Sequence, residues 1–245
     1  MSFGAVTALA DVSMQVGRAE ITGLVGDNGA GKSTLVKLVS GVLRPSSGEI
    51  MFDGRAVAFG SPSAAREAGI ETVYQDLALA PNMAVWANIF TGREMIRGPR
   101  FLQMLDRRAM IARTREMLGQ YDMNIPPIEG KVEGLSGGQR QIIAIARAAT
   151  WGSRLIIMDE PTAALGVAET RAVEAVILNL RAQGHSILII SHNLDQVFRL
   201  TDAIWVLRRG RMVGHARTAE TTPNAIVASI TGADVVQNGS GHASD

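Results

Sequence analysis

A glycine-rich run near the N-terminus could bind phosphate. It consists of Gly26, Asp27, Asn28, Gly29, Ala30, Gly31, Lys32, Ser33 and Thr34. It lies between an apolar run at 21–25 and a helical pattern from 35, and this GxxxxGKS/T spacing is typical there of a phosphate-binding loop. Glycines let backbone N–H groups turn toward phosphate oxygens, and the following helix adds its free amides. Lys32 would reach the β- and γ-phosphates of a nucleoside triphosphate, and the Ser33 hydroxyl would bind Mg²⁺.

Two carboxylates end a second apolar run. Asp159 and Glu160 follow residues 155–158, which have the composition of a strand buried on both faces of a parallel sheet. Ligands bind beyond the carboxyl ends of such strands, so we expect both groups beside the phosphate loop. Asp159 would hold Mg²⁺ through water, and Glu160 would polarise the water that attacks the γ-phosphate. The structural alternative is an acidic cap before Pro161 and Thr162.

Two further polar residues follow apolar runs and are candidates for the same crevice. His192 comes shortly after residues 187–190, and Gln75 follows a short β-prone run. We expect His192 to contact the γ-phosphate and the Gln75 amide to contact Mg²⁺ and the attacking water. A strand-end histidine is more often structural and a glutamine alone is not diagnostic, so both assignments depend on the phosphate loop.

A second glycine-containing segment follows Leu135 and precedes a helix with an apolar face at 142–149. The segment consists of Ser136, Gly137, Gly138 and Gln139. Its serine can cap the helix and its glycines allow close approach, which makes a second helix N-terminus that could bind phosphate. One nucleotide does not need two phosphate-binding segments from one chain. We therefore expect a head-to-tail dimer in which each subunit's segment closes the other subunit's site.

The remaining pattern predicts an α/β fold. The apolar runs at 155–158 and 187–190 predict parallel strands, and the helix between them has an apolar face that ends before Gly184. Hairpins are predicted at 49–59 and 203–213. Residues 85–134 lack buried-strand runs and contain a helix from about Asp106, which we interpret as a helical insertion. The residues of this helix at helical spacing are Met110, Met117, Leu118 and Tyr121.

Composition excludes several classes of site. The chain of 245 residues has no cysteine, which excludes disulfides, zinc–thiolate clusters and thiol chemistry. Its net charge is +1 and neither half carries a basic block, so no nucleic-acid surface is expected. No apolar run has the length of a membrane span and no signal pattern opens the chain. Contact with a membrane would therefore come through a partner.

The phosphate loop, Gln75, residues 135–139, the pair at 159–160 and His192 resemble the ATP-binding cassette (ABC) ATPases in order and approximate spacing. The resemblance covers essentially the whole chain. It implies a P-loop NTPase core, a mostly parallel sheet flanked by helices, with an antiparallel β subdomain and a helical subdomain inserted at about 85–150. It also implies a single ABC ATPase domain at 1–232, and the small polar residues at 233–245 predict a disordered tail.

The resemblance implies an ATPase that uses ATP and Mg²⁺ and powers a membrane transporter as a dimer. Segments 61–79, 88–94 and 161–167 look like those of bacterial importers of simple sugars such as ribose, xylose and fructose. The implied partners are a second copy of the chain, membrane permease subunits and, indirectly, a periplasmic solute-binding protein. The chain would then lie at the cytoplasmic face of the inner membrane. We expect the apolar stretch 77–83 to receive a short permease helix.

The chain departs from the family pattern at two places that bear on function. Gly166 stands where the family usually has an aspartate that contacts the other subunit. Phe3 would be the aromatic that stacks on adenine, but the family has another strand ahead of it, so either that strand is missing here or the start is misassigned. The alternative function is a soluble ABC ATPase acting on DNA or the ribosome. Such proteins carry long coiled-coil or zinc-bearing insertions, or two cassettes, which this sequence lacks.

Overall fold

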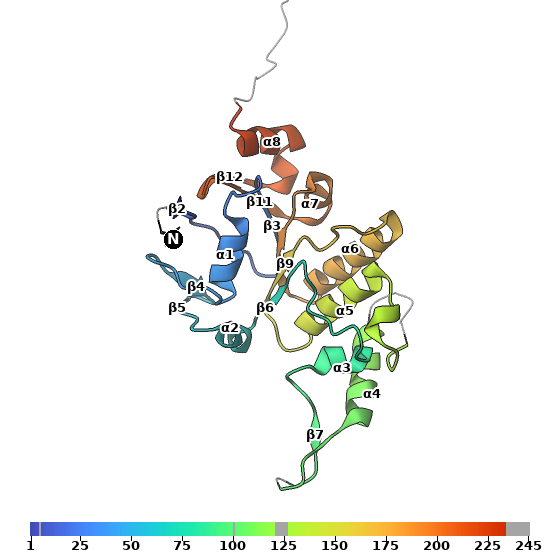
Figure 1. The fold of residues 1–245 in the computed structure, drawn as a ribbon. Coiled ribbons are helices and arrows are strands. Elements are labelled where there is room, and N and C mark those ends of the chain that lie inside the picture. The colour runs from blue at the N-terminus through green and yellow to red at the C-terminus, as the bar shows by residue number, and fades with distance from the viewer. Residues whose placement is uncertain (5, 100, 121–126, 234–245) are drawn as a thin grey trace, which may run out of the picture.

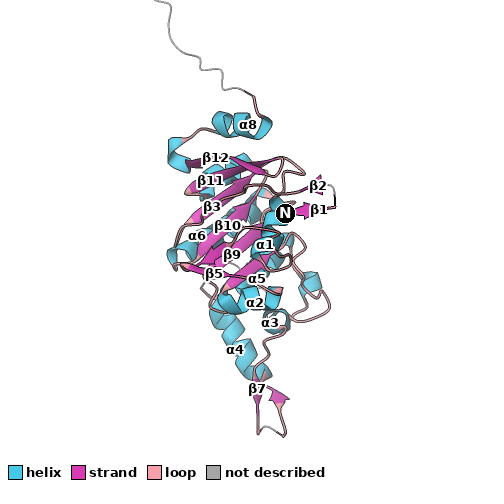
Figure 2. Cartoon of the chain, turned by 90° about the vertical axis from the view of Figure 1, so that its left-hand side faces the viewer, coloured by secondary structure: helices cyan, strands magenta, loops and turns pink. Residues whose placement is uncertain are grey.

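The structure, a computed structural model, describes residues 1–4, 6–99, 101–120 and 127–233. Within these residues the centre of the fold is a six-stranded sheet with the order β12–β11–β3–β10–β9–β6 (Figures 1 and 2). The strands are β3 (Ile21–Val25), β6 (Ile70–Val73), β9 (Leu155–Asp159), β10 (Ser186–Ile190), β11 (Ala203–Arg208) and β12 (Arg211–Arg217). Neighbouring strands are parallel except β11 and β12, which are antiparallel.

Helices cover both faces of this sheet. They are α1 (Lys32–Val39), α2 (Pro62–Ala68), α3 (Val85–Phe90), α4 (Arg107–Leu118), α5 (Gly137–Ala149), α6 (Val167–Ala182), α7 (Leu194–Leu200) and α8 (Pro223–Thr231). Short 3₁₀ turns lie at Val132–Gly134 and Thr218–Glu220. Several helices begin where a side chain accepts a hydrogen bond from a backbone amide of the first turn, as helix caps do. The capping residues are Ser61, Asp106, Ser136, Asn193 and Thr222.

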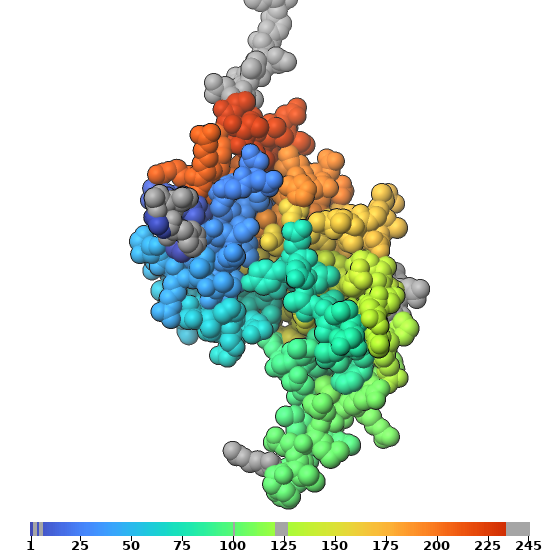
Figure 3. Space-filling model, viewed as in Figure 1, coloured from blue at the N-terminus to red at the C-terminus, as the bar shows by residue number. Residues whose placement is uncertain are grey.

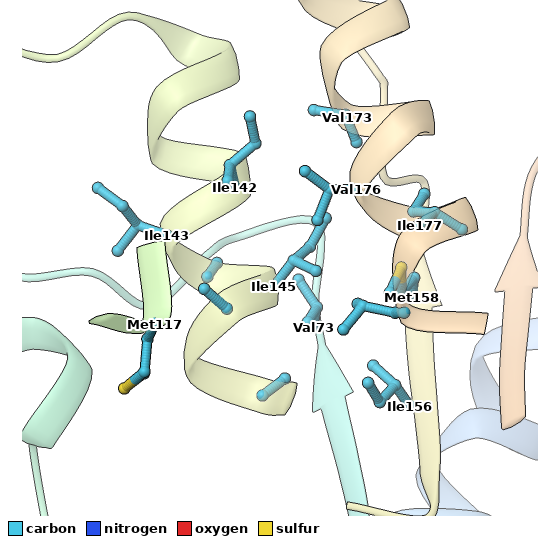
Figure 4. Packing of buried hydrophobic residues seen from close by; sticks show 14 of the residues in the cluster. Val73, Met117, Ile142, Ile143, Ile145, Ile156, Met158, Val173, Val176 and Ile177 are labelled. Atoms are coloured by element: carbon cyan, nitrogen blue, oxygen red, sulfur yellow. The ribbon is translucent and has the colours of Figure 1, made fainter. Parts of the chain in front are cut away.

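The core forms on two sides of the sheet because strand side chains alternate between its faces. On β9, Leu155 and Ile157 pack with residues of α1 and α2. Their neighbours Ile156 and Met158 pack instead with α5 and α6, whose interleaved side chains Figure 4 shows. Both faces of β9 are therefore buried, which explains why its sequence is a continuous apolar run.

The strands and hairpins predicted from the sequence are confirmed, with shifted ends. The first predicted hairpin is β4 (Ile50–Phe52) with β5 (Arg55–Val57). The second is β11 with β12, but β12 extends farther than predicted and β11 also pairs in parallel with β3. The place of this second hairpin in the central sheet could not be predicted, because the spacing of a hairpin does not reveal which strand pairs with the other edge of β11. A short pair at the N-terminus, β1 (Ser2–Phe3) with β2 (Val6–Thr7), was not predicted.

The chain between β6 and β9 is mostly helical. The predicted helix is α4, which begins after Asp106 and buries Met110, Met117 and Leu118, whereas Tyr121 lies outside the described residues. Phe90 at the end of α3 is only 1% exposed, and its ring meets that of Trp151 edge to face at 5.3 Å. Helices α3 and α4 both contact α5, so α5 connects this helical part to the sheet.

A short hairpin projects from the helical part and was not predicted. Its strands are β7 (Ile96–Arg97) and β8 (Met104–Leu105), and they are too short to give a periodic pattern. Phe101 near its tip is 89% exposed. Figure 3 shows this green segment extending away from the body of the molecule. None of the helices that the structure describes is long and apolar enough to cross a membrane. Of the predicted tail at 233–245, residues 234–245 lie outside the described part.

Phe90→Ala should lower the free energy of unfolding by about 3 to 5 kcal/mol, because it removes a fully buried ring and leaves a cavity beside Trp151. Phe101→Ala is the matched control and should change stability by no more than about 0.5 kcal/mol, since that ring is exposed. Urea unfolding of the two variants and the parent chain measures both values. Equal losses would contradict the assigned packing.

Candidate functional site

The register of the central strands brings the predicted site residues to one edge of the sheet. Ile190 on β10 pairs with Leu24 on β3 and with Asp159 on β9. The three strands therefore end at the same level. The phosphate loop follows β3, Glu160 follows β9 and His192 follows β10. Residues far apart in the sequence thus meet at the carboxyl edge, where parallel sheets bind ligands.

The lysine of the phosphate loop forms hydrogen bonds with the loop's own backbone. The Lys32 ammonium donates hydrogen bonds to the carbonyl oxygens of Gly26 at 2.7 Å and Asp27 at 3.0 Å. Gly26 has φ 156°, and a Cβ there would lie 2.1 Å from the Leu207 carbonyl oxygen, so this position requires glycine. Ser33 and Thr34 lie in the first turn of α1, directly after the loop. The loop is therefore curled around Lys32, as a phosphate cradle requires.

Partly buried charges of opposite sign face one another beside the loop. Burial lowers the pKa of Lys32, against the opposing effect of Glu160, Asp159 and Asp27. Burial also raises the pKa of Asp159, and the Glu160 charge raises it further, while Lys32 acts in the opposite direction. The two carboxylates therefore repel each other, and a cation near them is favourable.

Glu160 and His192 are in direct contact. A Glu160 carboxylate oxygen, Oε1, lies 2.7 Å from His192 Nδ1 and accepts a hydrogen bond from the His192 backbone amide at 3.0 Å. Glu160 itself has φ 51°, a left-handed conformation that costs a non-glycine residue of order 1 kcal/mol or more. The Glu160 side chain is 16% exposed and that of His192 73%. The turn after β9 thus aims a shielded carboxylate at an imidazole that is open to solvent.

A buried glutamine that the sequence analysis missed connects these turns. The Gln196 amide nitrogen donates to the Thr162 hydroxyl at 2.7 Å, and its oxygen accepts from the Ser191 hydroxyl at 3.1 Å. Ser191 in turn accepts from the Asn193 backbone amide at 3.1 Å. Gln196 therefore fixes the segment after Glu160 against the segment that carries His192. The sequence itself shows only a glutamine four residues after a candidate histidine, and its burial becomes visible in the structure.

Gln75 lies at the same edge of the sheet, because β6 pairs with β9 and Gln75 follows β6 by two residues. Its side chain is exposed. The segment after it is held by Arg147 of α5, whose guanidinium donates to the carbonyl oxygens of Leu77 at 2.9 Å and Ala78 at 3.1 Å. The Asn88 side chain also bonds to this segment, at both the amide and the carbonyl of residue 80. Sequence reasoning missed Arg147 and Asn88, for which no motif gives a signal.

The segment at 136–139 caps α5 as predicted. The Ser136 hydroxyl accepts from the Gln139 amide at 3.3 Å, and the Gln139 side-chain oxygen accepts from the Ser136 amide at 3.0 Å. This reciprocal pair is a capping box. Among the described residues, the side-chain hydrogen bonds of this segment lead to itself and to Glu169 of α6, and not to the phosphate loop of the same chain.

Glu169 was not predicted, although a glutamate three residues after a helix-capping position is a known sequence signal. Its Oε1 accepts from the Gly138 amide at 3.2 Å, and its Oε2 accepts from the Gly166 amide at 3.2 Å. The carboxylate therefore caps both α5 and its own helix α6. The other predicted binding residue, Phe3, belongs to β1, but its side chain lies outside the described part of the structure.

The predicted Mg²⁺ donors are a hydroxyl, an amide and a carboxylate, from Ser33, Gln75 and Asp159. The described residues contain no group of three histidines, cysteines or acidic residues that could hold a metal by themselves. Mg²⁺ is often held by one or two carboxylates together with substrate phosphates, so this oxygen donor set fits that mode of binding. The half-buried Asp159, whose charge burial disfavours, is the carboxylate that such a cation would stabilise.

Comparison with known proteins identifies the family. The family model named ABC transporter matches residues 9–163, more than half of the chain. The xylose/arabinose import ATP-binding protein of Sulfolobus acidocaldarius is 45% identical over 94% of this chain and 90% of that protein. The fructose import ATP-binding protein of Rhizobium meliloti is 47% identical over 94% of this chain and 90% of that protein.

A solved structure agrees with the sequence comparisons. The ADP conformation of an ATP-binding cassette from an ABC transporter superposes with a TM-score of 0.80 at 26% identity, over 96% of this chain and 93% of that one. The predicted fold class, an α/β cassette with a mostly parallel sheet, an antiparallel β part and helices, is thereby confirmed. With a cassette fold and close relatives along nearly its whole length, this chain belongs to the ABC transporter family.

Proposed function

We propose that this chain binds and hydrolyses ATP as the subunit that powers a membrane importer of a simple sugar. The observation that carries the proposal is the near-full-length similarity to the two sugar import ATP-binding proteins. The site supports the chemistry, because the phosphate loop, Asp159, Glu160 and His192 meet at one edge of the sheet. The alternative, a soluble ABC ATPase on DNA or the ribosome, is not favoured by these relatives.

Nucleotide binding begins with the loop and its lysine. The curled loop presents backbone amides to the phosphates, and α1 adds its N-terminal amides. Lys32, now bonded to the carbonyls of Gly26 and Asp27, would turn to the β- and γ-phosphates. Ser33, Gln75 and Asp159 would hold Mg²⁺, which supplies charge neutralisation of the phosphate oxygens when bound. Phe3 would stack on the adenine.

Hydrolysis depends on the pair formed by Glu160 and His192. The shielded Glu160 carboxylate is the candidate base that accepts a proton from the attacking water. The bond from His192 Nδ1 holds this carboxylate in position. Donation from Nε2 toward the γ-phosphate at the same time requires a proton on both imidazole nitrogens. Gln196 keeps the two turns in register through Thr162 and Ser191. The chain thus supplies orientation and a proton acceptor, and orientation together with electrostatic stabilisation is the main protein contribution in phosphoryl transfer.

The second phosphate-binding device supports a head-to-tail dimer. The segment of Ser136, Gly137, Gly138 and Gln139 lies at the start of α5. In the described part of the chain, its hydrogen bonds do not lead to the phosphate loop. In the proposed dimer these residues approach the nucleotide held by the other subunit. ATP then acts as a bridge between two copies, and hydrolysis removes the bridge.

Coupling to transport would occur through permease subunits at the cytoplasmic face of the inner membrane, with a periplasmic solute-binding protein acting indirectly. The proposed permease contact at 77–83 is narrower than its apolar sequence suggests. Leu77 and Leu79 are partly buried against the core, whereas Pro81 and Met83 are exposed. We therefore place the contact for a permease helix at residues 81–83, beside the segment that Arg147 holds.

Lys32→Ala should abolish ATP binding or weaken it strongly, since no other described cation is bonded to the loop carbonyls. Calorimetric titration with Mg-ATP measures this loss. Lys37→Ala, an exposed lysine on the same helix, is the matched control and should bind as the parent does. Unchanged affinity in Lys32→Ala would exclude the loop as the phosphate site.

Glu160→Gln should retain ATP binding and slow hydrolysis by about a hundredfold or more, the size expected for loss of a positioned base. Because ATP then persists between the subunits, this variant should accumulate as a dimer with Mg-ATP on size exclusion. Glu67→Gln, an exposed glutamate on α2, should hydrolyse ATP at the parent rate. If Glu160→Gln also turned over at the parent rate, another group would be the base.

The transport assignment is tested by reconstitution. Alone, the chain should show low ATPase activity that does not respond to sugars. With its permease and solute-binding protein in proteoliposomes, xylose, arabinose, fructose or ribose should stimulate ATP hydrolysis. Stimulation of the isolated chain by DNA or ribosomes would instead support the alternative.

A further inference from the structure

The carboxylate of Glu169 occupies a phosphate-binding position of this chain. It accepts a hydrogen bond from the Gly138 amide, one of the amides at the start of α5 that have no acceptor within the helix. The nearby Ser136 hydroxyl is the largest of the effects that lower the pKa of Glu169, followed by the backbone hydrogen bonds from Gly138 and Gly166. A helix-start amide that donates to an anion beside a serine hydroxyl forms an anion site, and here the anion is part of the chain.

The fit of Glu169 to this position depends on glycine. A Cβ at Gly138 would lie 2.8 Å from the Glu169 Cβ and 3.0 Å from its Cγ, too close for a real contact. The missing side chain therefore lets the glutamate lie directly against the helix start. The same carboxylate bonds to the Gly166 amide through its other oxygen. Glu169 thus bridges the start of α5 and the segment that follows Glu160.

We propose that Glu169 is an internal substitute for the γ-phosphate, which the nucleotide of the partner subunit must displace from Ser136 and Gly138 when the dimer closes. This inference rests on the proposed head-to-tail dimer. Both anions need the same donors, and two negative groups cannot share them. Glu169 therefore raises the ATP concentration needed for closure, and it returns to the donors when phosphate leaves, which favours reopening. It is a positioning residue, since it acts through Ser136 and Gly138.

The test measures ATP-driven dimerisation in the Glu160→Gln background by size exclusion with light scattering over a titration of Mg-ATP. Adding Glu169→Gln keeps the size of the side chain but removes its charge. The ATP concentration for half-maximal dimer should fall by about tenfold, because a neutral amide competes more weakly than a charge-assisted acceptor. Glu169→Asp retains the charge but has a shorter reach, and it should lower the concentration by a smaller factor. Adding Glu67→Gln should leave it unchanged.

Two further measurements distinguish displacement of Glu169 by the γ-phosphate from a purely structural role of Glu169. ATP affinity of the monomer, measured by calorimetry in dilute protein, should be the same with and without Glu169→Gln, since Glu169 serves the partner's nucleotide. With Glu160 intact, Glu169→Gln should lower the KM for ATP without raising kcat. If Glu169 only anchored α5, both Glu169 variants would instead require more ATP for the dimer.

The outcomes separate this inference from the function on which it rests. In one outcome, the Glu160→Gln variant forms the dimer while Glu169→Gln leaves unchanged, or raises, the ATP concentration for half-maximal dimer. This result would overturn the displacement of Glu169 by the γ-phosphate and leave the proposed function standing. Absence of any ATP-driven dimer in Glu160→Gln would overturn both. A lowered requirement together with an unchanged monomer affinity is the result that the proposal expects.

Discussion

The site depends on one constraint, the pairing of the central strand β10 with β3 on one side and β9 on the other. Because Ile190 is in register with both Leu24 and Asp159, the ends of three parallel strands are fixed at one height. A slip of one residue would turn every side chain of a strand to the opposite face and bury the wrong set. The core on both faces of the sheet therefore also determines where the phosphate loop, Glu160 and His192 meet.

The charged groups at this edge of the sheet interact with one another and with the loop. Lys32 is bonded to loop carbonyls and lies in the field of Asp159 and Glu160, while Glu160 is bonded to His192. Lys32 and Glu160 thus each have a hydrogen-bond partner inside a partly buried site, where an unpaired charge would be costly. In the proposed function, nucleotide phosphates would replace the loop carbonyls as partners of Lys32.

Much of this arrangement could be predicted from the sequence, because continuous apolar runs and glycine spacing are strong signals. The strands before the loop, before Asp159 and before His192 are where the pattern predicted them. Contacts between distant residues could not be predicted in the same way. The bond between Glu160 and His192, the Gln196 bridge and the two roles of Glu169 arise from tertiary packing of segments that carry no shared motif. The short β7–β8 hairpin escaped prediction because two-residue strands have no period.

Helix α5 connects the segment at 136–139 with the segment that follows Gln75. Its first residues are bonded to Glu169 and face the proposed partner, whereas Arg147 near its last turn is bonded to the segment that follows Gln75. A helix of 13 residues is about 20 Å long and rigid along its axis. Its sides are packed against α3, α4, α6 and β6. In the proposed dimer, a change in what occupies Ser136 and Gly138 would reach the Gln75 segment through a shift of the whole helix. Such a link needs no flexible path, because a single packed helix joins both contacts.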